Sequence, residues 1–270
     1  MSDVRNKKMD TAMNDLLSRQ DYLVTQANEL ARSFGNLRTF EHKVLDYCFS
    51  FVEKEDLKDK EYTLVVSDIL KHFGLNLSGK NYNRVLLAFK KLNENTAIYM
   101  QITRKNGKKA IVMTSLFDHI TVVEDGVIEF SFSSKIAPYV FELKRNFYSF
   151  KLSELCRIKS KYTISLLKLW NANAFGKWRD YSDPNSLPPS VTIQGTLEDW
   201  QSWFLGADEY GTPKRWPAGR FKQKALDVAI KEISELYPKT LITVTTMKHG
   251  RRVTGYTLDI YPISTSLIVN

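Results

Sequence analysis

The residue types that most often carry out catalysis are scattered through this chain. Thirteen tyrosines are candidate nucleophiles, but none has the metal-binding partner that such chemistry needs. No His-x-His pair exists to hold the metal of a rolling-circle nickase, and no cysteine–histidine spacing suits zinc. The four histidines lie far apart in sequence, at His42, His72, His119 and His249. We therefore predict no catalytic residue, no metal and no cofactor.

One segment partly matches a phosphate-binding loop. Residues 74–80 (GLNLSGK) fit the first seven positions of GxxxxGK[ST], but Asn81 lacks the hydroxyl that would hold magnesium. A helix, rather than the required strand, is predicted before it. Two acidic pairs, at 124–125 and 208–209, fall in predicted turns, where solvated carboxylates are common. None of these segments predicts an active site.

Composition favours a folded chain of two domains. The chain has 270 residues, with 43% hydrophobic and 12% aromatic residues, and domains usually have about 100–200 residues. No run of about 18 apolar residues could cross a membrane, and the polar N-terminus lacks the apolar stretch of a secretory signal. Cys48 and Cys156 lie in apolar helical patterns, which predicts two buried thiols in a reducing cytosol.

The positive charge is concentrated in two segments. The formal net charge is +9. Residues 80–109 hold eight basic side chains and one acidic side chain, and residues 213–252 hold ten basic and three acidic, so each segment carries +7. The remainder of the chain carries −5. This distribution indicates a mildly acidic body with two strongly basic patches, which suits a protein that binds one polyanion at two places.

The hydrophobic pattern of the first half predicts helices, a strand and two hairpins. Thr39 and Ser67 are expected to cap helices, and Asn106-Gly107 is typical of a tight hairpin turn. The first elements are helices over 22–34 and 39–52, followed by a strand over 62–66 and helices over 68–73 and 81–93. Strands over 97–104 and 109–114 come next, then a hairpin around Asp125-Gly126 and a closing helix over 136–143.

The second half repeats this order without recognisable sequence identity. Ser160 and Thr196 are expected to begin helices. The elements are a helix over 160–170, a strand over 191–194, helices over 196–204 and 220–236, and strands over 241–247 and 253–260 joined by 248–251. The core face of the long helix is predicted to consist of Phe221, Ala225, Val228, Ala229, Ile233 and Leu236.

Each half therefore has the element order of a winged helix-turn-helix, which predicts an α+β fold of two tandem winged-helix domains related by pseudo-duplication. A recognition helix packs one face on its own domain and places the other in the major groove of DNA, while the wing contacts phosphates. In the first half the predicted DNA contacts are Lys80, Asn83, Arg84, Lys91, Arg104, Lys105, Lys108 and Lys109. In the second half they are Lys214, Arg215, Arg220, Lys222, Gln223, Lys224, Lys231, Lys248, Arg251 and Arg252.

The tryptophans have a different expected role. Trp200, Trp203 and Phe204 lie at i, i+3 and i+4, which predicts core positions. Trp216 precedes Pro217 at the entry of the second basic helix. It either packs against the domain or touches the DNA backbone, and we favour packing.

Four stretches, within residues 24–260, carry a resemblance to a known family. They are Gln26–Ala31 (QANELA) with Leu37 and Phe40–Leu45 (FEHKVL), Ile136–Val140 (IAPYV) with Leu143, Lys144 and Phe147, Ile158–Tyr162 (IKSKY) with Leu166, Leu167 and Leu169, and Arg220–Ile233 (RFKQKALDVAIKEI) with Lys248–Val253 (KHGRRV) and Leu258. The chain resembles the iteron-binding replication initiator (Rep) proteins of theta-replicating bacterial plasmids, of the RepB or RepE type. It departs from the family pattern at Ser165 and Leu167, where relatives often carry Arg and Tyr.

The resemblance implies that the chain binds double-stranded origin repeats, the iterons, as a monomer and starts theta replication. It also implies recruitment of the host replication initiator and replicative helicase. Dimers, formed largely through the N-terminal domain, would repress the protein's own promoter and limit plasmid copy number.

We expect a flexible arm over 1–20, an N-terminal winged-helix domain over 21–145 for DNA binding and dimerisation, and a C-terminal winged-helix domain over 146–270 for sequence-specific DNA binding. No enzymatic activity is expected. The alternatives are a tandem winged-helix transcriptional regulator with no replication role and, in a different class, an origin nickase.

Overall fold

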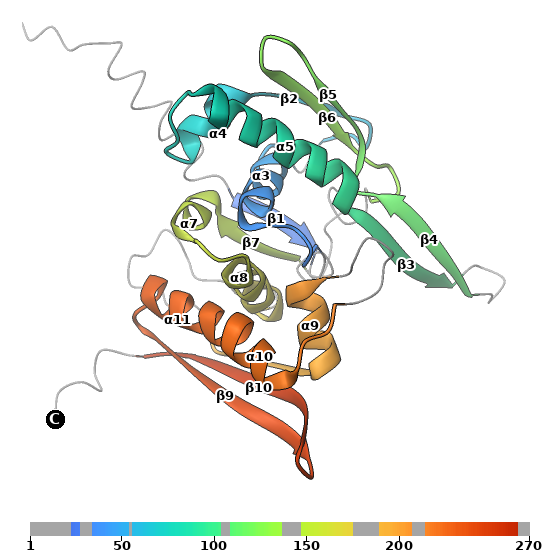
Figure 1. The fold of residues 1–270 in the computed structure, drawn as a ribbon. Coiled ribbons are helices and arrows are strands. Elements are labelled where there is room, and N and C mark those ends of the chain that lie inside the picture. The colour runs from blue at the N-terminus through green and yellow to red at the C-terminus, as the bar shows by residue number, and fades with distance from the viewer. Residues whose placement is uncertain are drawn as a thin grey trace, which may run out of the picture. The chain divides into compact units, whose positions relative to one another are not determined.

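The computed structural model describes residues 23–27, 34–53, 56–103, 109–136, 147–174, 189–206 and 214–263 (Figure 1). The predicted arm over 1–20, the Asn106-Gly107 turn and all but the first residue of the predicted closing helix lie outside these residues. The elements are β1 (Leu23–Ala27), α3 (Thr39–Phe49), β2 (Glu61–Val65), α4 (Val66–His72), α5 (Gly79–Asn95), β3 (Ala97–Thr103), β4 (Lys109–Ser115), β5 (Phe117–Val122), β6 (Val127–Phe132), β7 (Phe147–Lys151), α7 (Leu152–Arg157), α8 (Lys161–Asn173), β8 (Val191–Thr196), α9 (Leu197–Leu205), α10 (Ala218–Phe221), η1 (Lys222–Leu226), α11 (Asp227–Leu236), β9 (Thr240–His249) and β10 (Arg252–Pro262).

The chain divides into two compact units, each assembled from several segments. The first is drawn from Met1–Val24, Lys43–Ala137 and Phe150–Arg157. The second is drawn from Thr25–His42, Pro138–Ser149 and Ile158–Asn270. The division at 145/146 stays a prediction.

The first unit places two helices against a small antiparallel sheet. The sheet has the strand order β2-β6-β5, and α5 contacts both α4 and β5 (Figure 1). Strands β3 and β4 form a separate antiparallel hairpin that pairs Thr103 with Lys109. The core of the unit is an aromatic cluster of stacked and edge-to-face rings, made by Phe49, Tyr62, Phe117, Phe130 and Phe132.

Local sequence explains the elements of this unit. The Ser78 side chain accepts a hydrogen bond from the Asn81 backbone N–H at 3.4 Å, so α5 begins at a capped end. The second hairpin turns at Gly126, whose φ of +88° is a conformation that glycine adopts without strain. The Asp125 carboxylate accepts from the Val127 N–H at 3.0 Å, which closes the predicted turn.

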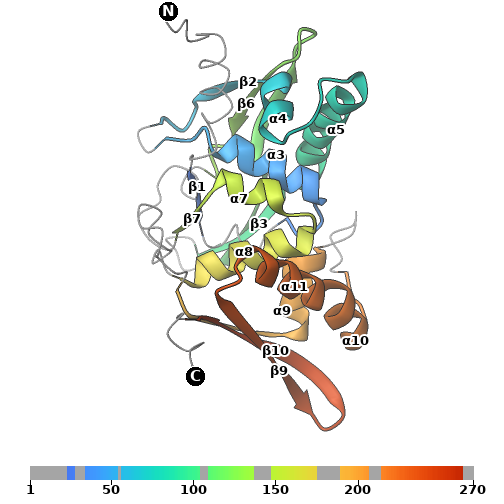
Figure 2. The same ribbon diagram turned by 90° about the vertical axis from the view of Figure 1, so that its left-hand side faces the viewer.

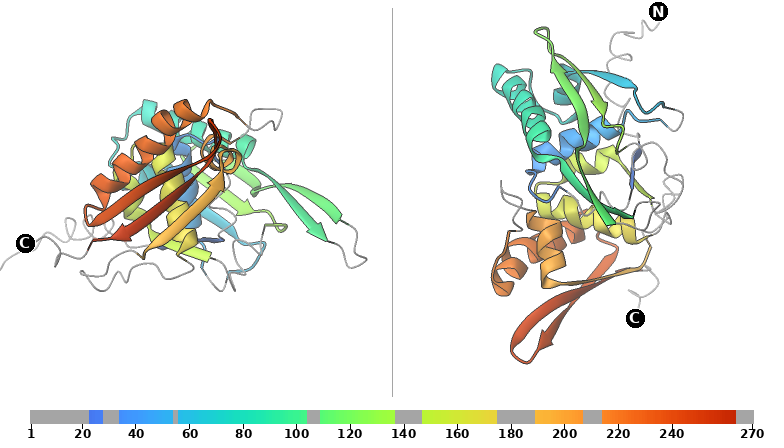
Figure 3. Two further views of the ribbon diagram at one scale, coloured as in Figure 1. Left: turned by 90° about the horizontal axis from the view of Figure 1, so that it is seen from below. Right: turned by 90° about the vertical axis from the view of Figure 1, so that its right-hand side faces the viewer.

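The second unit places α8, α9 and α11 against the antiparallel sheet β8-β10-β9. Figures 2 and 3 show β9 and β10 as one long twisted hairpin beside these helices. A capping box begins α9, because Thr196 and Asp199 each accept from the backbone N–H of the other. The buried aromatic side chains of the unit include Trp170, Trp200, Phe204, Phe221 and Tyr256.

The predicted helix over 22–34 was wrong where the structure describes it, because residues 23–27 form strand β1. This strand pairs with β7. The hydrophobic pattern predicted neither β7 nor the helix that follows it, α7. The β-branched Val24 and Thr25 suit a strand. A partner strand more than 100 residues away decides the conformation, and helical periodicity over a short window does not detect such a partner.

Two smaller predictions were also wrong. Ser67 was predicted to cap a helix, but helix α4 begins at Val66, so Ser67 lies within it. No side chain caps the start of this helix. In the long helix, Val228 is 40% exposed and Leu236 is half-buried, whereas Leu226 is completely buried. The cause is η1, one turn of π-helix whose extra residue rotates the following side chains around the helix axis.

Candidate nucleic-acid interface

Helix α5 has the two faces that a recognition helix needs. Val85, Ala88, Phe89 and Leu92 are buried at spacings of three and four residues. The predicted contact residues of this helix are all exposed, namely Lys80, Asn83, Arg84 and Lys91. Leu87 is also exposed, at 51%, and lies on the polar face. In the sequence, Leu87 stands seven residues after Lys80 and three after Arg84, and this helical spacing indicates that Leu87 shares their face of α5.

The C-terminal end of α5 is less positive than its sequence suggests. Lys91 Nζ lies 2.6 Å from a carboxylate oxygen of Glu94, and Lys90 Nζ lies 3.7 Å from the other oxygen. The hydrogen bond from Lys91 holds the pKa of the Glu94 carboxyl below its ordinary value. The N-terminal part of α5, with Lys80 and Arg84, therefore presents the stronger positive field.

The first hairpin contributes one described residue to the predicted set. Lys109 begins β4 and pairs with Thr103. Three predicted contact residues lie outside the described part of the chain, namely Arg104, Lys105 and Lys108.

The second unit carries its basic residues on the helix formed by α10, η1 and α11. Phe221, Ala225, Ala229 and Ile233 face the core, at regular spacings of four residues. Arg220, Gln223, Lys224 and Lys231 are exposed on the other side. Lys222 is half-buried, and its Nζ lies 2.7 Å from a carboxylate oxygen of Asp227.

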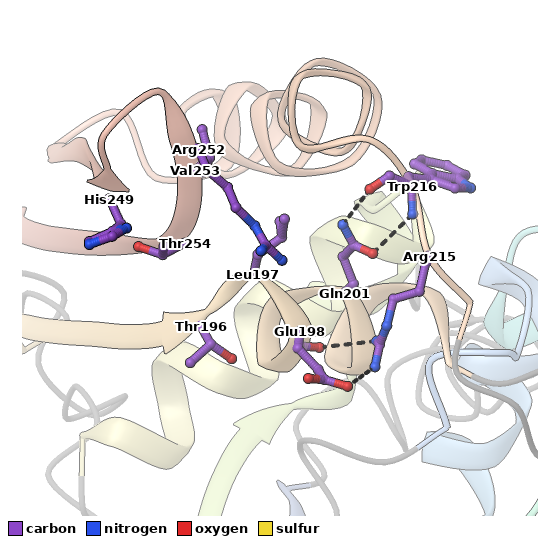
Figure 4. Close-up of a pocket in the computed structure, with 10 residues that line it drawn as sticks. All are labelled: Thr196, Leu197, Glu198, Gln201, Arg215, Trp216, His249, Arg252, Val253 and Thr254. Atoms are coloured by element: carbon purple, nitrogen blue, oxygen red, sulfur yellow. Dashed lines mark hydrogen bonds and ion pairs between the residues drawn. The ribbon is translucent and has the colours of Figure 1, made fainter.

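Trp216 packs at the beginning of this helix, as the sequence favoured. Its backbone N–H donates to Gln201 Oε1 at 2.9 Å, and its carbonyl accepts from Gln201 Nε2 at 2.7 Å (Figure 4). Its ring lies edge-on to Tyr162, with the ring centres 6.4 Å apart. The guanidinium of Arg220 lies over the same ring. Packing does not remove Trp216 from the site, since it supports a predicted contact residue.

Arg215 has an acidic partner that the sequence did not predict. Its guanidinium forms an ion pair with Glu198 of α9 (Figure 4). Both residues line a pocket of about 460 Å³ that also includes residues of the second hairpin. The ten lining residues are Thr196, Leu197, Glu198, Gln201, Arg215, Trp216, His249, Arg252, Val253 and Thr254.

The second hairpin presents its cations at the turn between β9 and β10. Gly250 has a φ of +59°, which permits the tight reversal there. Lys248, Arg251 and Arg252 are exposed around it, and Lys214 is exposed before α10. The second unit therefore combines a basic helix face with a basic hairpin tip, and both are suited to a polyanion.

Metal-ligating residue types and free thiols were also located in the described part of the chain. Its histidines, cysteines and acidic residues form no group of three or more that could hold a metal ion. Cys48 is buried as predicted, but Cys156 is only half-buried, and both are free thiols. Among the same residues, no helix is long and apolar enough to span a membrane.

Comparison with protein families decides the identity. The family model described as "Initiator Replication protein, WH1" matches residues 23–171, and "Initiator Rep protein, WH2" matches residues 196–260. The chain belongs to the initiator replication (Rep) protein family. It is a replication initiator protein with two winged-helix domains, WH1 and WH2, which confirms the predicted fold class and family.

The chain is also similar to solved structures. The Pi initiator protein in complex with iteron DNA is 17% identical to the chain, with a TM-score of 0.68, over 91% of this chain and 99% of that chain. Domains 2 and 3 of RctB are 12% identical, with a TM-score of 0.43, over 76% of this chain and 75% of that chain. The WH1 domain of MSBI1.176, a replication protein, is 15% identical, with a TM-score of 0.30, over 57% and 95%. A search of curated protein sequences found no significant match.

Proposed function

We propose that this initiator protein starts plasmid replication by binding iterons, directly repeated double-stranded sites at the origin. The observation that carries the proposal is that each unit exposes a basic helix face, around Arg84 in α5 and around Arg220 in α10. Cationic helices of this kind suit the major groove. The likeness to the Pi initiator, solved with iteron DNA, supports iterons as the ligand.

The two predicted domains divide the work of binding. The N-terminal domain, residues 21–145, contacts DNA through α5 and the β3–β4 hairpin and also forms the dimer. The C-terminal domain, residues 146–270, supplies most of the sequence specificity, because Arg reads base edges better than Lys does. Of its arginines, Arg220 on the basic helix is assigned to base edges, and the flanking phosphates are assigned to Arg215, Arg251 and Arg252.

The protein acts without an enzymatic step of its own. Its role in the bacterial cytoplasm is to bind the origin, help melt the adjacent AT-rich DNA and recruit the host replication initiator and replicative helicase. The dimer represses the protein's own promoter and limits plasmid copy number. Two recognition helices reach successive major grooves, about 10 bp apart, so one chain covers roughly two turns of duplex.

Charge reversal of the second basic helix tests the DNA-binding part of the proposal. The Arg220→Glu/Lys224→Glu variant should lose specific binding to an iteron duplex in a gel-shift titration. The Lys58→Glu/Lys135→Glu variant is a matched control, because it makes the same change in net charge at exposed turn residues outside both basic patches. Wild-type affinity in the first variant, or equal losses in both, would refute the assignment of the helix.

Replication itself requires a second measurement. A plasmid with the cognate origin should fail to replicate in cells when this gene is deleted, and a copy supplied in trans should restore it. Continued replication would instead identify a transcriptional regulator. A tyrosine-linked product after incubation with supercoiled origin DNA and a divalent metal would identify a nickase.

A further inference from the structure

Leu87 is an exposed aliphatic side chain inside the basic face of α5. Its neighbours one helical turn away are Asn83 and Arg84 on one side and Lys90 and Lys91 on the other. Its side chain is 51% exposed, although Val85 and Ala88 on the opposite face are buried. An apolar side chain is thus surrounded by four polar or cationic ones.

Neither the fold nor the helix requires leucine at this position. Leucine and lysine have similar helix propensities, so α5 would form equally well with a charged residue there. An apolar protein partner would have to approach across Arg84, Lys90 and Lys91 and remove them from water, which is unfavourable. A partner surface that is anionic at its edges and apolar at one point between them matches Leu87 and the surrounding cations better than an apolar protein surface does.

The major groove of DNA has this chemistry. Phosphates line its edges, and each thymine presents a C5-methyl group on its floor, which only an apolar side chain can recognise by contact. Leu87 is eight residues from the start of α5 at Gly79, about 12 Å along the helix axis. It therefore lies in the third turn of α5, one turn after Asn83 and Arg84.

The second unit repeats the arrangement. Val228 is 40% exposed and lies between Lys224, four residues before it, and Lys231, three residues after it. Its acidic neighbour Glu232 accepts hydrogen bonds from the backbone N–H groups of Lys159 and Ser160, so that carboxylate is engaged within the unit. The π-helical turn η1 brings Val228 to the surface, although the sequence periodicity placed it in the core. Each basic helix thus carries one exposed aliphatic residue between cations.

We propose that Leu87 and Val228 each contact the C5-methyl group of a thymine and so determine where the protein requires thymine in its binding site. The proposal rests on the proposed function, since it assigns sequence readout to the same two helix faces. The arginines discriminate the other bases, and these two aliphatic side chains add discrimination between thymine and the remaining pyrimidine and purine bases.

Uracil substitution tests the proposal, because deoxyuridine differs from thymidine only by the methyl group. The full chain first selects its preferred site from random-sequence duplexes. Each thymine of that site is then replaced singly by deoxyuridine, and the dissociation constant is measured. Loss of one buried methyl contact should weaken binding about fourfold at the contacted positions.

Alanine variants identify the side chain that reads each position. In Leu87→Ala, uracil should no longer weaken binding at one set of positions, and in Val228→Ala at a different set. Alanine favours helix, so both variants should fold. Leu57→Ala is the matched control, because Leu57 is 73% exposed in the segment before β2, outside the basic patches, and should leave the uracil pattern unchanged.

The outcomes separate this inference from the proposed function. If selection yields no preferred sequence, the proposed function fails and this inference fails with it. If a sequence is selected but uracil weakens binding equally in wild type and both variants, the methyl group acts through DNA shape and only the inference is overturned. Insensitivity of the wild type to every uracil overturns it as well.

Discussion

The guanidinium carbon of Arg220 lies 4.8 Å from the centre of the Trp216 ring. The Gln201 side chain donates one hydrogen bond to the Trp216 backbone and accepts another from it, which fixes the backbone that carries the ring. A cation over an aromatic ring is stabilised by about 0.5–1 kcal/mol at an exposed site. In the proposed interface, the ring therefore orients Arg220 before DNA arrives, which lowers the entropy lost on binding.

Trp216→Ala removes the ring and should weaken specific DNA binding about two- to fivefold, because the lost cation–ring contact contributes about 0.5–1 kcal/mol. Trp216→Phe should retain most of the affinity. Fluorescence anisotropy with an iteron duplex measures the effect, and the double variant with Arg220→Ala tests its origin. If Trp216→Ala weakens binding further when Arg220 is already alanine, the ring acts by another route.

Neutralising Glu198 should strengthen DNA binding. Arg215 forms an ion pair with Glu198 in the free protein, so Glu198→Gln releases a cation for phosphate contact. One additional phosphate contact should steepen the slope of log affinity against log salt by about 0.9. Glu124→Gln removes an equal charge from an exposed turn of the first unit and should leave the slope unchanged. A weaker or unaltered affinity in Glu198→Gln would show that Arg215 does not reach the duplex.

Removal of the cations at the second hairpin tip should weaken binding to all sequences alike. In Arg251→Ala/Arg252→Ala, two phosphate contacts are lost, so the salt slope should become shallower by about 1.8. If wild type contacts about eight phosphates, its own slope should be near −7. Salt titrations of a specific and a scrambled duplex give both numbers. A loss confined to the specific duplex would instead assign these arginines to base readout.

Stability should depend on pH through Lys161. Burial, with Lys214 as a lesser cause, lowers the pKa of Lys161 from 10.5 to about 8, and its Nζ donates to the Gly35 carbonyl at 2.7 Å. Between pH 8 and 10.5 the unfolded chain binds more protons at this residue than the folded chain does. The contribution of Lys161 to the free energy of unfolding therefore rises with pH through this window, by at most about 3 kcal/mol, and is constant below it.

Urea unfolding at pH 7.5 and pH 10 checks this dependence. Relative to Lys161→Met, wild type should gain stability at the higher pH. The exposed neighbour Lys159 supplies the control, since Lys159→Met should follow the wild-type profile. Parallel profiles for wild type and Lys161→Met would contradict the assignment.

Much of this protein was predictable from the sequence, because the features concerned depend on neighbours within one or two turns. The two faces of α5 follow from apolar spacing, the start of α9 from Thr196 and its capping box, and the β5–β6 turn from Asp125-Gly126. The family resemblance rests on the same kind of local pattern, and the family models confirm it. The clustering of charge into two basic patches is also a property of the sequence alone.

Other features required the tertiary structure, because they depend on residues far apart in the chain or on small changes in helix geometry. Strand β1 exists because β7 pairs with it. The ion pair of Arg215 depends on Glu198, seventeen residues earlier, and the π-helical turn moves Val228 out of the core. Periodicity gives the direction of a side chain from an ideal helix, so it fails where an extra residue rotates the helix. The sequence by itself determined which helices are basic, and the tertiary structure decided which of their side chains lie at the surface.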